Sequence, residues 1–99
     1  MAAGGDAVQV APHVYTVVFE NKRVRVLDIL LKPGAKSAIH THPEYVLYAI
    51  TPTKVKFTNE AGTATEVEFP AGATWRDAEA HAVENIGSAD AHAIAIELK

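Results

Sequence analysis

Eight short runs of β-branched and aromatic residues, separated by turn-forming residues, constrain the fold of this chain more than any other feature. The breaks contain Pro, Gly, Asn and Asp, and no segment between them is long enough for a substantial helix. Strands at this spacing predict an all-β protein, a sandwich or barrel of antiparallel strands. The predicted strands are Val14–Glu20, Arg23–Leu31, Tyr45–Ile50, Lys54–Thr58, Ala64–Phe69, Thr74–Asp77, His81–Ile86 and His92–Leu98.

The alternation of side chains predicts which way some of these strands face. In Lys54–Thr58, Val55 and Phe57 alternate with lysines, and in Ala64–Phe69 apolar residues alternate with glutamates. Paired as a hairpin, these strands would place lysines opposite glutamates, and each cross-strand pair would contribute about 0.2–1 kcal/mol. The same alternation in the last strand predicts one inward-facing set: His92, Ile94, Ile96 and Leu98.

The length of the chain, 99 residues with 48% hydrophobic and 21% charged content, fits one compact domain and is too short for two. The first residues are mostly Gly and Ala without periodicity, so residues 1–7 are predicted to form a flexible N-terminal tail. Residues 8–99 are predicted to form a single β-barrel domain.

The charge of the chain argues against nucleic acid as a partner. Its 9 basic and 12 acidic residues give a net charge of −3, and no basic cluster is longer than Lys22-Arg23. The sequence contains neither a long apolar run nor the pattern of a signal peptide. We therefore expect no membrane association and a soluble, cytoplasmic protein.

Two histidines separated by one residue, His40 and His42, form the first candidate metal site. Residues two apart in a strand lie on one face about 6.6–7 Å apart, so both imidazoles can converge on one ion. Glu44 follows two residues later and is a further candidate ligand. The chain has no cysteine, so a metal would be held by His, Asp or Glu. A third imidazole, His81, shares a strand face with Asn85 and could join the first two.

The arrangement of Gly34, His40 and His42, followed by His81 and Asn85, resembles the two conserved motifs of the cupin superfamily. This resemblance implies an antiparallel double-stranded β-helix, which is the jelly-roll β-barrel of cupins. It also implies a metal site in the barrel with three imidazole ligands, His40, His42 and His81.

The resemblance departs from the usual cupin pattern at the carboxylate ligand. Cupins usually place a ligating glutamate three or four residues beyond the second histidine, where this chain has Val46 and Leu47. Glu44 stands closer to the histidines and remains a candidate ligand. Some cupins bind their metal through three histidines without a carboxylate, and the thiol dioxygenases are an example. The resemblance therefore still implies one divalent transition metal. Fe, Mn, Ni, Zn and Cu all stay open, because imidazole binds each of them.

The resemblance leads to functions of two classes. The first is a small metal-dependent enzyme that acts on a small polar molecule in the barrel, as a dioxygenase, isomerase or lyase. The second is a non-catalytic module that binds or senses a metal or small molecule, and a structural cupin without a metal is a further alternative. We also expect a homodimer, because exposed edge strands of a small barrel can pair between copies.

Four further residues are predicted to line the pocket. Tyr48 shares the parity of the histidines, and Trp75 is large enough to form a pocket wall. Asn85 and His92 are expected to face the interior from their strands. Three charged residues just before His81 are placed in a loop near the mouth of the barrel, where they would be solvated or would orient a polar substrate: Arg76, Asp77 and Glu79.

Overall fold

The computed structural model describes residues 5–99 of the chain. Within this range, no helix has the length and apolar character required to cross a membrane. The elements are β1 (Gly5–Asp6), α1 (Ala7–Val10), β2 (Tyr15–Glu20), β3 (Val24–Leu31), β4 (Lys36–His42), β5 (Tyr45–Ala49), β6 (Thr53–Thr58), β7 (Ala64–Phe69), β8 (Gly72–Arg76), β9 (Glu79–Asn85) and β10 (Ala91–Leu98).

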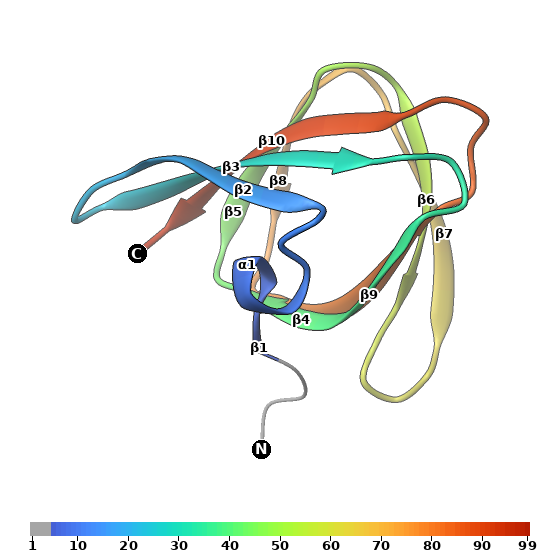
Figure 1. Cartoon of the computed structure of the whole chain (residues 1–99), viewed down its shortest axis with the longest axis horizontal. Coiled ribbons are helices and arrows are strands. Elements are labelled where there is room, and N and C mark those ends of the chain that lie inside the picture. The colour runs from blue at the N-terminus through green and yellow to red at the C-terminus, as the bar shows by residue number, and fades with distance from the viewer. Residues whose placement is uncertain (1–4) are drawn as a thin grey trace.

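The strands form two five-stranded sheets that enclose a common interior (Figure 1). Sheet A has the strand order β1-β4-β9-β6-β7, and sheet B has the order β2-β3-β10-β5-β8. Neighbouring strands pair antiparallel except β1, which runs parallel to β4. From β3 to β6 the chain changes sheet at every turn. The predicted all-β, antiparallel jelly-roll architecture is therefore confirmed.

The segment between the second and third predicted strands forms β4, which carries the first two histidines. A turn with Gly34 at a φ of 79° leads into it, a conformation that favours glycine. Backbone hydrogen bonds tie this turn to β9: the Gly34 amide donates to the Asn85 carbonyl at 2.9 Å, and the Asn85 amide donates to Ala35 at 3.0 Å. These bonds bring the two histidine-bearing strands together.

The N-terminal segment is structured from Gly5 onward, so the predicted flexible tail is wrong for residues 5–7. Gly5 and Asp6 pair with β4, and the Asp6 side chain accepts a hydrogen bond from the Val8 amide at the start of α1. Ala7 is completely buried. Pairing and burial stabilise this segment although its composition is rich in small residues. Residues 1–4 of the predicted tail lie outside the described residues.

The last strand, β10, faces the opposite way from the prediction, because its alanines and Glu97 point inward. Ala95 is paired with Leu27 on β3 and with Leu47 on β5, and both leucines are buried. A small side chain between two large ones packs without overlap. The residues predicted to face inward therefore lie on the outside of sheet B: His92, Ile94, Ile96 and Leu98.

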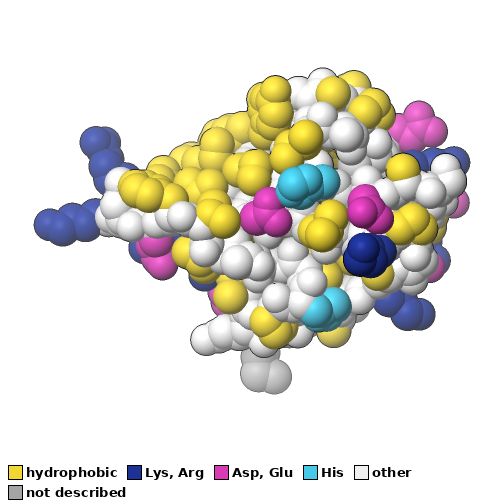
Figure 2. All heavy atoms as spheres, turned by 45° about the horizontal axis from the view of Figure 1, so that its top comes forward, with side chains coloured by type: hydrophobic (Ala, Val, Ile, Leu, Met, Phe, Trp, Pro, Cys, Tyr) yellow, Lys and Arg dark blue, Asp and Glu magenta, His cyan; other side chains and the backbone are white. Residues whose placement is uncertain are grey.

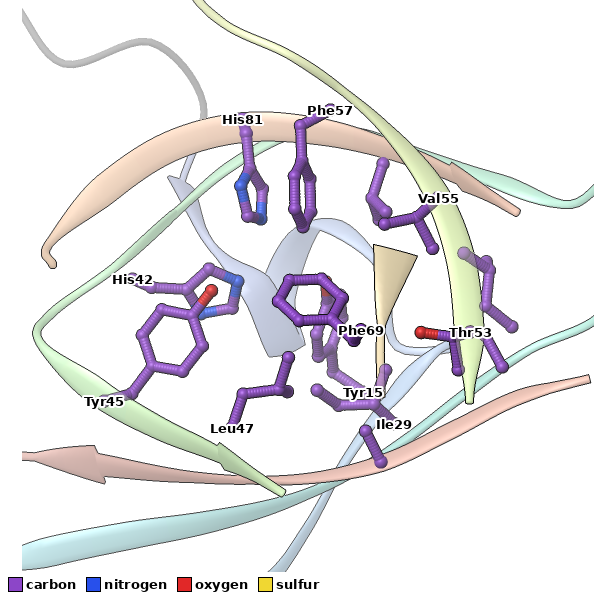
Figure 3. Close-up of a pocket in the computed structure, with 14 residues that line it drawn as sticks. Tyr15, Ile29, His42, Tyr45, Leu47, Thr53, Val55, Phe57, Phe69 and His81 are labelled. Atoms are coloured by element: carbon purple, nitrogen blue, oxygen red, sulfur yellow. The ribbon is translucent and has the colours of Figure 1, made fainter. Parts of the chain in front are cut away.

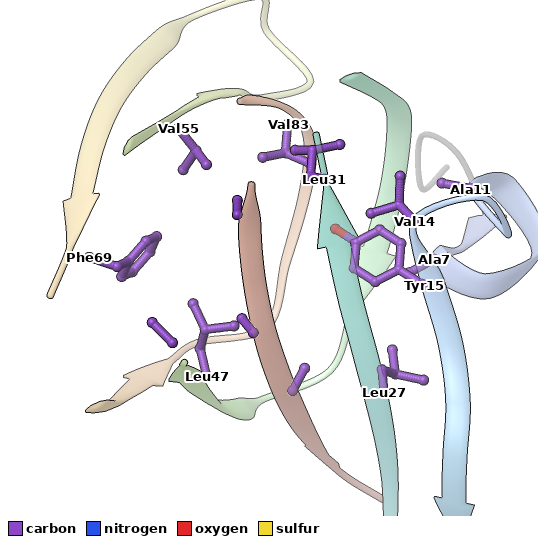
Figure 4. Packing of buried hydrophobic residues seen from close by; sticks show 14 of the residues in the cluster. Ala7, Ala11, Val14, Tyr15, Leu27, Leu31, Leu47, Val55, Phe69 and Val83 are labelled. Carbon is purple, nitrogen blue, oxygen red and sulfur yellow. The ribbon is translucent and has the colours of Figure 1, made fainter. Parts of the chain in front are cut away.

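The core is one cluster of buried hydrophobic side chains from both sheets and from α1. Figure 4 shows Leu27, Leu47, Val55 and Phe69 pointing into the space between the strands. Tyr15 lies in the same cluster and is 3% exposed. Its ring therefore borders both the apolar core and two histidines of β4, His40 and His42.

The outer faces of the two sheets differ in composition. On sheet A, Lys54 is opposite Glu68 and Lys56 is opposite Glu66, which confirms the predicted hairpin with its charged face. Lys56 also lies 3.3 Å from Glu84 on β9. The outer face of sheet B is largely apolar, and Figure 2 shows hydrophobic side chains gathered over the side of the molecule where β10 lies.

Candidate metal centre

Three imidazoles meet inside the barrel, His40 and His42 from β4 and His81 from β9. His40 and His81 are register partners in neighbouring strands, and His42 lies two residues further along the same face. The ring centroids are 4.8 Å apart for His40 and His42, 4.9 Å for His40 and His81, and 5.2 Å for His42 and His81. One donor nitrogen from each ring lies within 4.8 Å of the others, and all three residues are buried. The predicted meeting of these histidines is confirmed.

Each of the three rings is oriented by an acceptor at its Nδ1 atom. The His40 Nδ1 lies 2.8 Å from the Ala38 carbonyl, which can only accept a hydrogen bond. The Nδ1 atoms of His42 and His81 lie 2.8 Å from Glu97 and 3.0 Å from Glu79. Each Nδ1 therefore carries the proton, and each Nε2 keeps its lone pair. This is the tautomer in which Nε2 can bind a metal.

Glu97 connects His42 to a second set of charges. It is 2% exposed, and its other carboxylate oxygen accepts hydrogen bonds from Arg25 at 2.7 and 2.9 Å. Arg25 also binds Asp6 at the start of the chain, and this hydrogen bond is the main cause of its raised pKa. The buried carboxylate is thus paired on both sides, which lowers the cost of its burial.

Glu79, the first residue of β9, holds His81 in a similar way. The Tyr45 hydroxyl donates to Glu79 at 2.8 Å, and Arg76 donates to it at 2.9 and 3.1 Å. Burial alone would raise the pKa of this carboxyl, but the hydrogen bonds from His81, Arg76 and Tyr45 outweigh it and lower the pKa to about 2. Glu79 is therefore ionised at neutral pH and anchors the His81 ring.

Burial favours the neutral form of two of the imidazoles, those of His40 and His81. It lowers the pKa of His40 to about 4, assisted by repulsion from the neighbouring His42 and His81 and opposed by the hydrogen bond to Ala38. Burial also lowers the pKa of His81, against the attraction of Glu79. Neutral rings are the form that binds a metal ion.

Tyr15 contacts the centre from β2, and its hydroxyl lies 3.0 Å from the His40 Nε2. Burial raises the pKa of this phenol, so the group stays protonated. The hydroxyl donates to Nε2, since the Nδ1 of the same ring carries the proton. The Tyr15 ring also makes edge contacts with His40 and His42, with centroids at 4.9 and 5.5 Å.

A small pocket, open to solvent at its mouth, adjoins two of the imidazoles, those of His42 and His81 (Figure 3). Most of its wall is apolar, with Leu47, Val55 and Phe69 facing its interior. Phe57 stacks on His81 with centroids 4.4 Å apart and planes at 10°. The wall formed by the described residues contains no Lys, Arg, Asp or Glu side chain. The chain therefore combines a polar histidine cluster with an apolar cavity.

Comparison with solved structures identifies this architecture. A cupin-domain protein of Bordetella pertussis Tohama I matches with a TM-score of 0.79 and 24% identity, covering 100% of this chain and 98% of that chain. The chain has the cupin fold. An RmlC-like cupin family protein of Methanocaldococcus jannaschii covers 86% of this chain and 78% of its own, with a TM-score of 0.67 and 15% identity.

A conserved protein of Klebsiella pneumoniae with a double-stranded β-helix domain is similar as well, with a TM-score of 0.68 and 18% identity over 86% of this chain and 75% of that chain. No protein-family model and no curated protein sequence matches the chain. At these identities the structural similarity establishes the cupin fold and leaves the reaction to be argued from the site.

Two residues predicted for the site, Glu44 and Tyr48, are exposed. Glu44 lies in the corner between β4 and β5, outside the group formed by the histidines. Tyr48 is 50% exposed, whereas Tyr45 and Leu47 point inward. The predicted parity fails because the chain passes from sheet A to sheet B at this corner, so alternation does not continue through it.

The other three predicted pocket residues also lie away from the cavity wall. Trp75 is 53% exposed on the outer side of sheet B, since its neighbours Thr74 and Arg76 face the interior. Asn85 is buried, but its side chain binds the Leu31 and Ala89 carbonyls and the Gly87 amide, and so stabilises a turn. The ring of His92 binds Asp28 at 2.7 Å on the outer side of β10.

Sequence reasoning missed the residues that orient the imidazoles. Alternation in the last strand predicts that Glu97 faces outward, and the sequence predicts a solvated loop around Glu79. An acidic residue alternating with alanines, as Glu97 does, is a signal that could have marked it as buried and paired. Tyr15 and Tyr45 carried no comparable signal, because aromatic residues are common in strands.

Proposed function

We propose that this cupin binds one divalent transition metal through the Nε2 atoms of His40, His42 and His81 and uses it to act on a small molecule in the adjoining pocket. The observation that carries the proposal is the acceptor at every Nδ1, which leaves the Nε2 atoms of three buried rings as the lone-pair donors. A metal at the His40 Nε2 would take the place of the hydrogen bond that this atom accepts from the Tyr15 hydroxyl. Carboxylates and carbonyls in this position are typical partners of metal-binding histidines. Three neutral nitrogen ligands suit Fe, Mn, Ni, Zn or Cu.

When bound, such an ion would supply Lewis-acid or redox chemistry to a group that coordinates it. The chain's own residues hold the ligand rings through Glu97, Glu79 and the Ala38 carbonyl. The Tyr15 hydroxyl lies beside the donor nitrogens and is placed to donate a hydrogen bond to an atom held there. The wall on the opposite side of the pocket is apolar and offers no hydrogen-bonding group to water apart from the hydroxyl of Thr53.

The cavity wall narrows the class of small molecule. The sequence alone led to a small polar molecule, but the wall offers mainly Leu, Val and Phe side chains and no charged group. Such a wall favours a compact apolar body, since each buried methylene contributes about 0.8 kcal/mol. We propose a small molecule with one coordinating polar group directed at the histidines and an apolar remainder.

A metal-binding module without turnover is the second candidate function. The small size of the enclosed cavity and the absence of charged groups from its described wall favour it, because few side chains are available for proton transfer. Oxygen uptake and product analysis with a panel of thiols, diketones and small acids separate the two functions. Turnover that is lost in His40→Ala and His81→Ala favours the enzyme.

The decisive experiment is metal analysis of protein purified without a histidine tag. We expect about one equivalent of metal per chain, either as purified or after adding Fe, Mn, Ni, Zn or Cu. His40→Ala and His81→Ala should each lose it, whereas the matched control His92→Ala should retain it because this ring lies on the outer face. Less than about a tenth of an equivalent under all these conditions would contradict the proposal and favour a structural cupin.

The ligand class has its own test in the Co²⁺-loaded protein. Benzohydroxamate and acetohydroxamate share one coordinating group and differ in their apolar bodies. We expect benzohydroxamate to change the visible spectrum at a concentration at least about tenfold lower, since the ring would be buried against Phe and Leu side chains. Equal affinity for the two compounds would show that the apolar wall does not contact the ligand.

A further inference from the structure

The N-terminal segment, residues 5–15, borders the strand that carries two of the three histidines. In sheet A, β4 lies between β1 and β9, and Figure 1 shows β1 and α1 beside β4. Gly5 and Asp6 are the register partners of His40 and Thr41, and the Thr41 hydroxyl donates to the Gly5 carbonyl at 3.3 Å. At the end of the segment, the Tyr15 hydroxyl binds the His40 Nε2 at 3.0 Å. The segment therefore contacts the His40 region from both of its ends.

A chain of ionic hydrogen bonds connects the same segment to His42. Nη1 of Arg25 donates to Oδ2 of Asp6 at 3.0 Å, and Nη2 donates to the other oxygen of this carboxylate. Arg25 also donates twice to one oxygen of Glu97, and the second Glu97 oxygen lies 2.8 Å from the His42 Nδ1. The exposed fraction of the side chains falls from 32% at Asp6 to 17% at Arg25 and 2% at Glu97. Charge-assisted hydrogen bonds are strong where water is excluded.

The position of Asp6 depends on side-chain bonds more than on the sheet. Arg25 and Glu97 are register partners, so strand pairing already places them side by side. Asp6 belongs to a strand of only two residues, and its carboxylate is held by Arg25 and by the Val8 amide at 3.1 Å. One guanidinium therefore joins the docking of the N-terminal segment to the orientation of Glu97.

The third imidazole is held by a different set of residues. The Nδ1 of His81 lies 3.0 Å from Glu79, and that carboxylate accepts hydrogen bonds from Arg76 and Tyr45. These residues come from β5, β8 and β9, not from the N-terminal segment. His81 thus provides an internal reference for any effect of the segment on His42.

We propose that Asp6 and Arg25 are positioning residues of the metal centre, through which docking of the N-terminal segment and metal binding strengthen each other. The inference rests on the proposed function, because it concerns the same three-histidine site. Coupling between two sites is reciprocal, so the factor by which segment docking raises metal affinity is also the factor by which the metal favours docking.

The charges give the direction of the effect. Asp6 shares the guanidinium of Arg25 with Glu97, so Glu97 keeps more of its negative charge for the His42 Nδ1 proton. A stronger acceptor at Nδ1 makes Nε2 a better metal ligand and fixes the ring. Loss of the Asp6 charge should therefore weaken metal binding.

The first test is the affinity for Co²⁺, measured by competition with a chromophoric chelator. Asp6→Asn should lower the affinity by at least about fivefold. Arg25→Lys should also lower it, because an ammonium keeps the charge but lacks the planar fork that binds two carboxylates. Glu66→Gln is the matched control, since it removes one carboxylate charge from an exposed ion pair with Lys54 on sheet A. It should leave the affinity unchanged.

A double variant separates positioning from a general loss of structure. If Asp6 acts through Glu97, Asp6→Asn combined with Glu97→Gln should bind Co²⁺ no more weakly than Glu97→Gln alone. Losses that add fully in the double variant would show that Asp6 acts on the site independently of Glu97, and would overturn the proposal.

Hydrogen exchange tests the reciprocal effect. The Ala11 amide donates to the Ala7 carbonyl at 2.8 Å, and the Tyr15 amide donates to the Ala11 carbonyl at 3.0 Å, so exchange at these amides reports opening of the segment. Co²⁺ should slow their exchange in the wild type and should slow it less in Asp6→Asn. Equal slowing in the two proteins would contradict the coupling.

The metal-free protein provides a readout that does not depend on metal binding. In nitrogen-15 NMR spectra of the imidazoles, Asp6→Asn should shift the signals of His42 and leave those of His81 in place. Unchanged His42 signals, or wild-type Co²⁺ affinity in Asp6→Asn, would overturn the inference. A wild type that bound no Co²⁺ would contradict the proposed function, and the spectra of the metal-free proteins would still decide whether Asp6 positions His42.

Discussion

Sheet A and sheet B differ in the residues that they carry on their inner and outer faces. The inner face of sheet A carries all three histidines, and its outer face is a lysine and glutamate surface suited to water. The inner face of sheet B carries Glu97, Tyr15 and Tyr45, which hold or contact the histidine cluster, and its outer face is apolar. The comparison teaches that sheet A supplies the three candidate ligands and two of their Nδ1 partners, Ala38 and Glu79, whereas sheet B supplies the third partner, Glu97. Neither sheet alone would assemble the site.

The largest expected effect is on the pH dependence of the free energy of unfolding. It should depend on His40, which is buried on the inner face of sheet A, and not on His92, which lies on the outer face of sheet B. The pKa of His40 falls from 6.5 to about 4 in the fold, so the unfolded chain binds more protons between these values. In protein treated with a chelator, the stability from this neutral ring is fully present above pH 6.5 and is lost as pH falls toward 4. We expect the free energy of unfolding to drop by about 3 kcal/mol over this window, measured by urea titration.

His40→Gln should reduce this pH dependence, because the variant removes one titrating ring and leaves the contribution of His81. His92→Gln should leave it in place, since His92 is half-exposed on the outer face. Equal stability at pH 7 and pH 4.5 in the metal-free wild type would mean that the inner imidazoles are not held neutral by burial.

A second prediction tests the contribution of sheet B to the ligands on sheet A. Glu97→Gln keeps the shape of the side chain but replaces the charged acceptor at the His42 Nδ1. Loss of such a partner lowers metal affinity by about 10- to 100-fold. Competition with a chromophoric chelator measures this change, and Glu84→Gln on the outer face of sheet A provides the control. If Glu97→Gln bound metal as tightly as wild type, the orienting role assigned to sheet B would be wrong.

The smallest effect is expected on the outer face of sheet A. Lys56 lies 3.3 Å from Glu84, and both side chains are about a third exposed. Exposed pairs of this kind contribute roughly 0–1 kcal/mol, so Lys56→Met should lower the free energy of unfolding by less than about 1 kcal/mol. Chemical denaturation at low and high salt measures this difference. A loss of several kcal/mol would show that the Lys56–Glu84 ion pair stabilises the fold more than an exposed pair normally does.

The strands and the histidine cluster could be predicted from the sequence because they depend on local signals. Turn residues delimit the strands, and the spacing of His40 and His42 places them on one face. Their meeting with His81 followed from the motif resemblance and is found in the structure.

The direction in which side chains face could not be predicted across a change of sheet. Alternation holds within β4 and within β5, but the corner at Pro43 and Glu44 resets it, so Tyr45 and Leu47 face inward and Tyr48 does not. In β10, alternation predicts that the large residues face the interior, which holds only for a strand with one apolar face. The apolar outer face of sheet B makes that assumption fail.

The alanines of β10 have a consequence for the capacity of the barrel. Ala91 and Ala93 form part of the cavity wall, yet β10 contributes no imidazole to the cluster. A longer side chain at Ala93 would fill space beside the histidines without altering any of them. The alanines of the cavity wall and the imidazoles thus lie on different strands, and Ala91 or Ala93 can change in the course of evolution while the three histidines are retained.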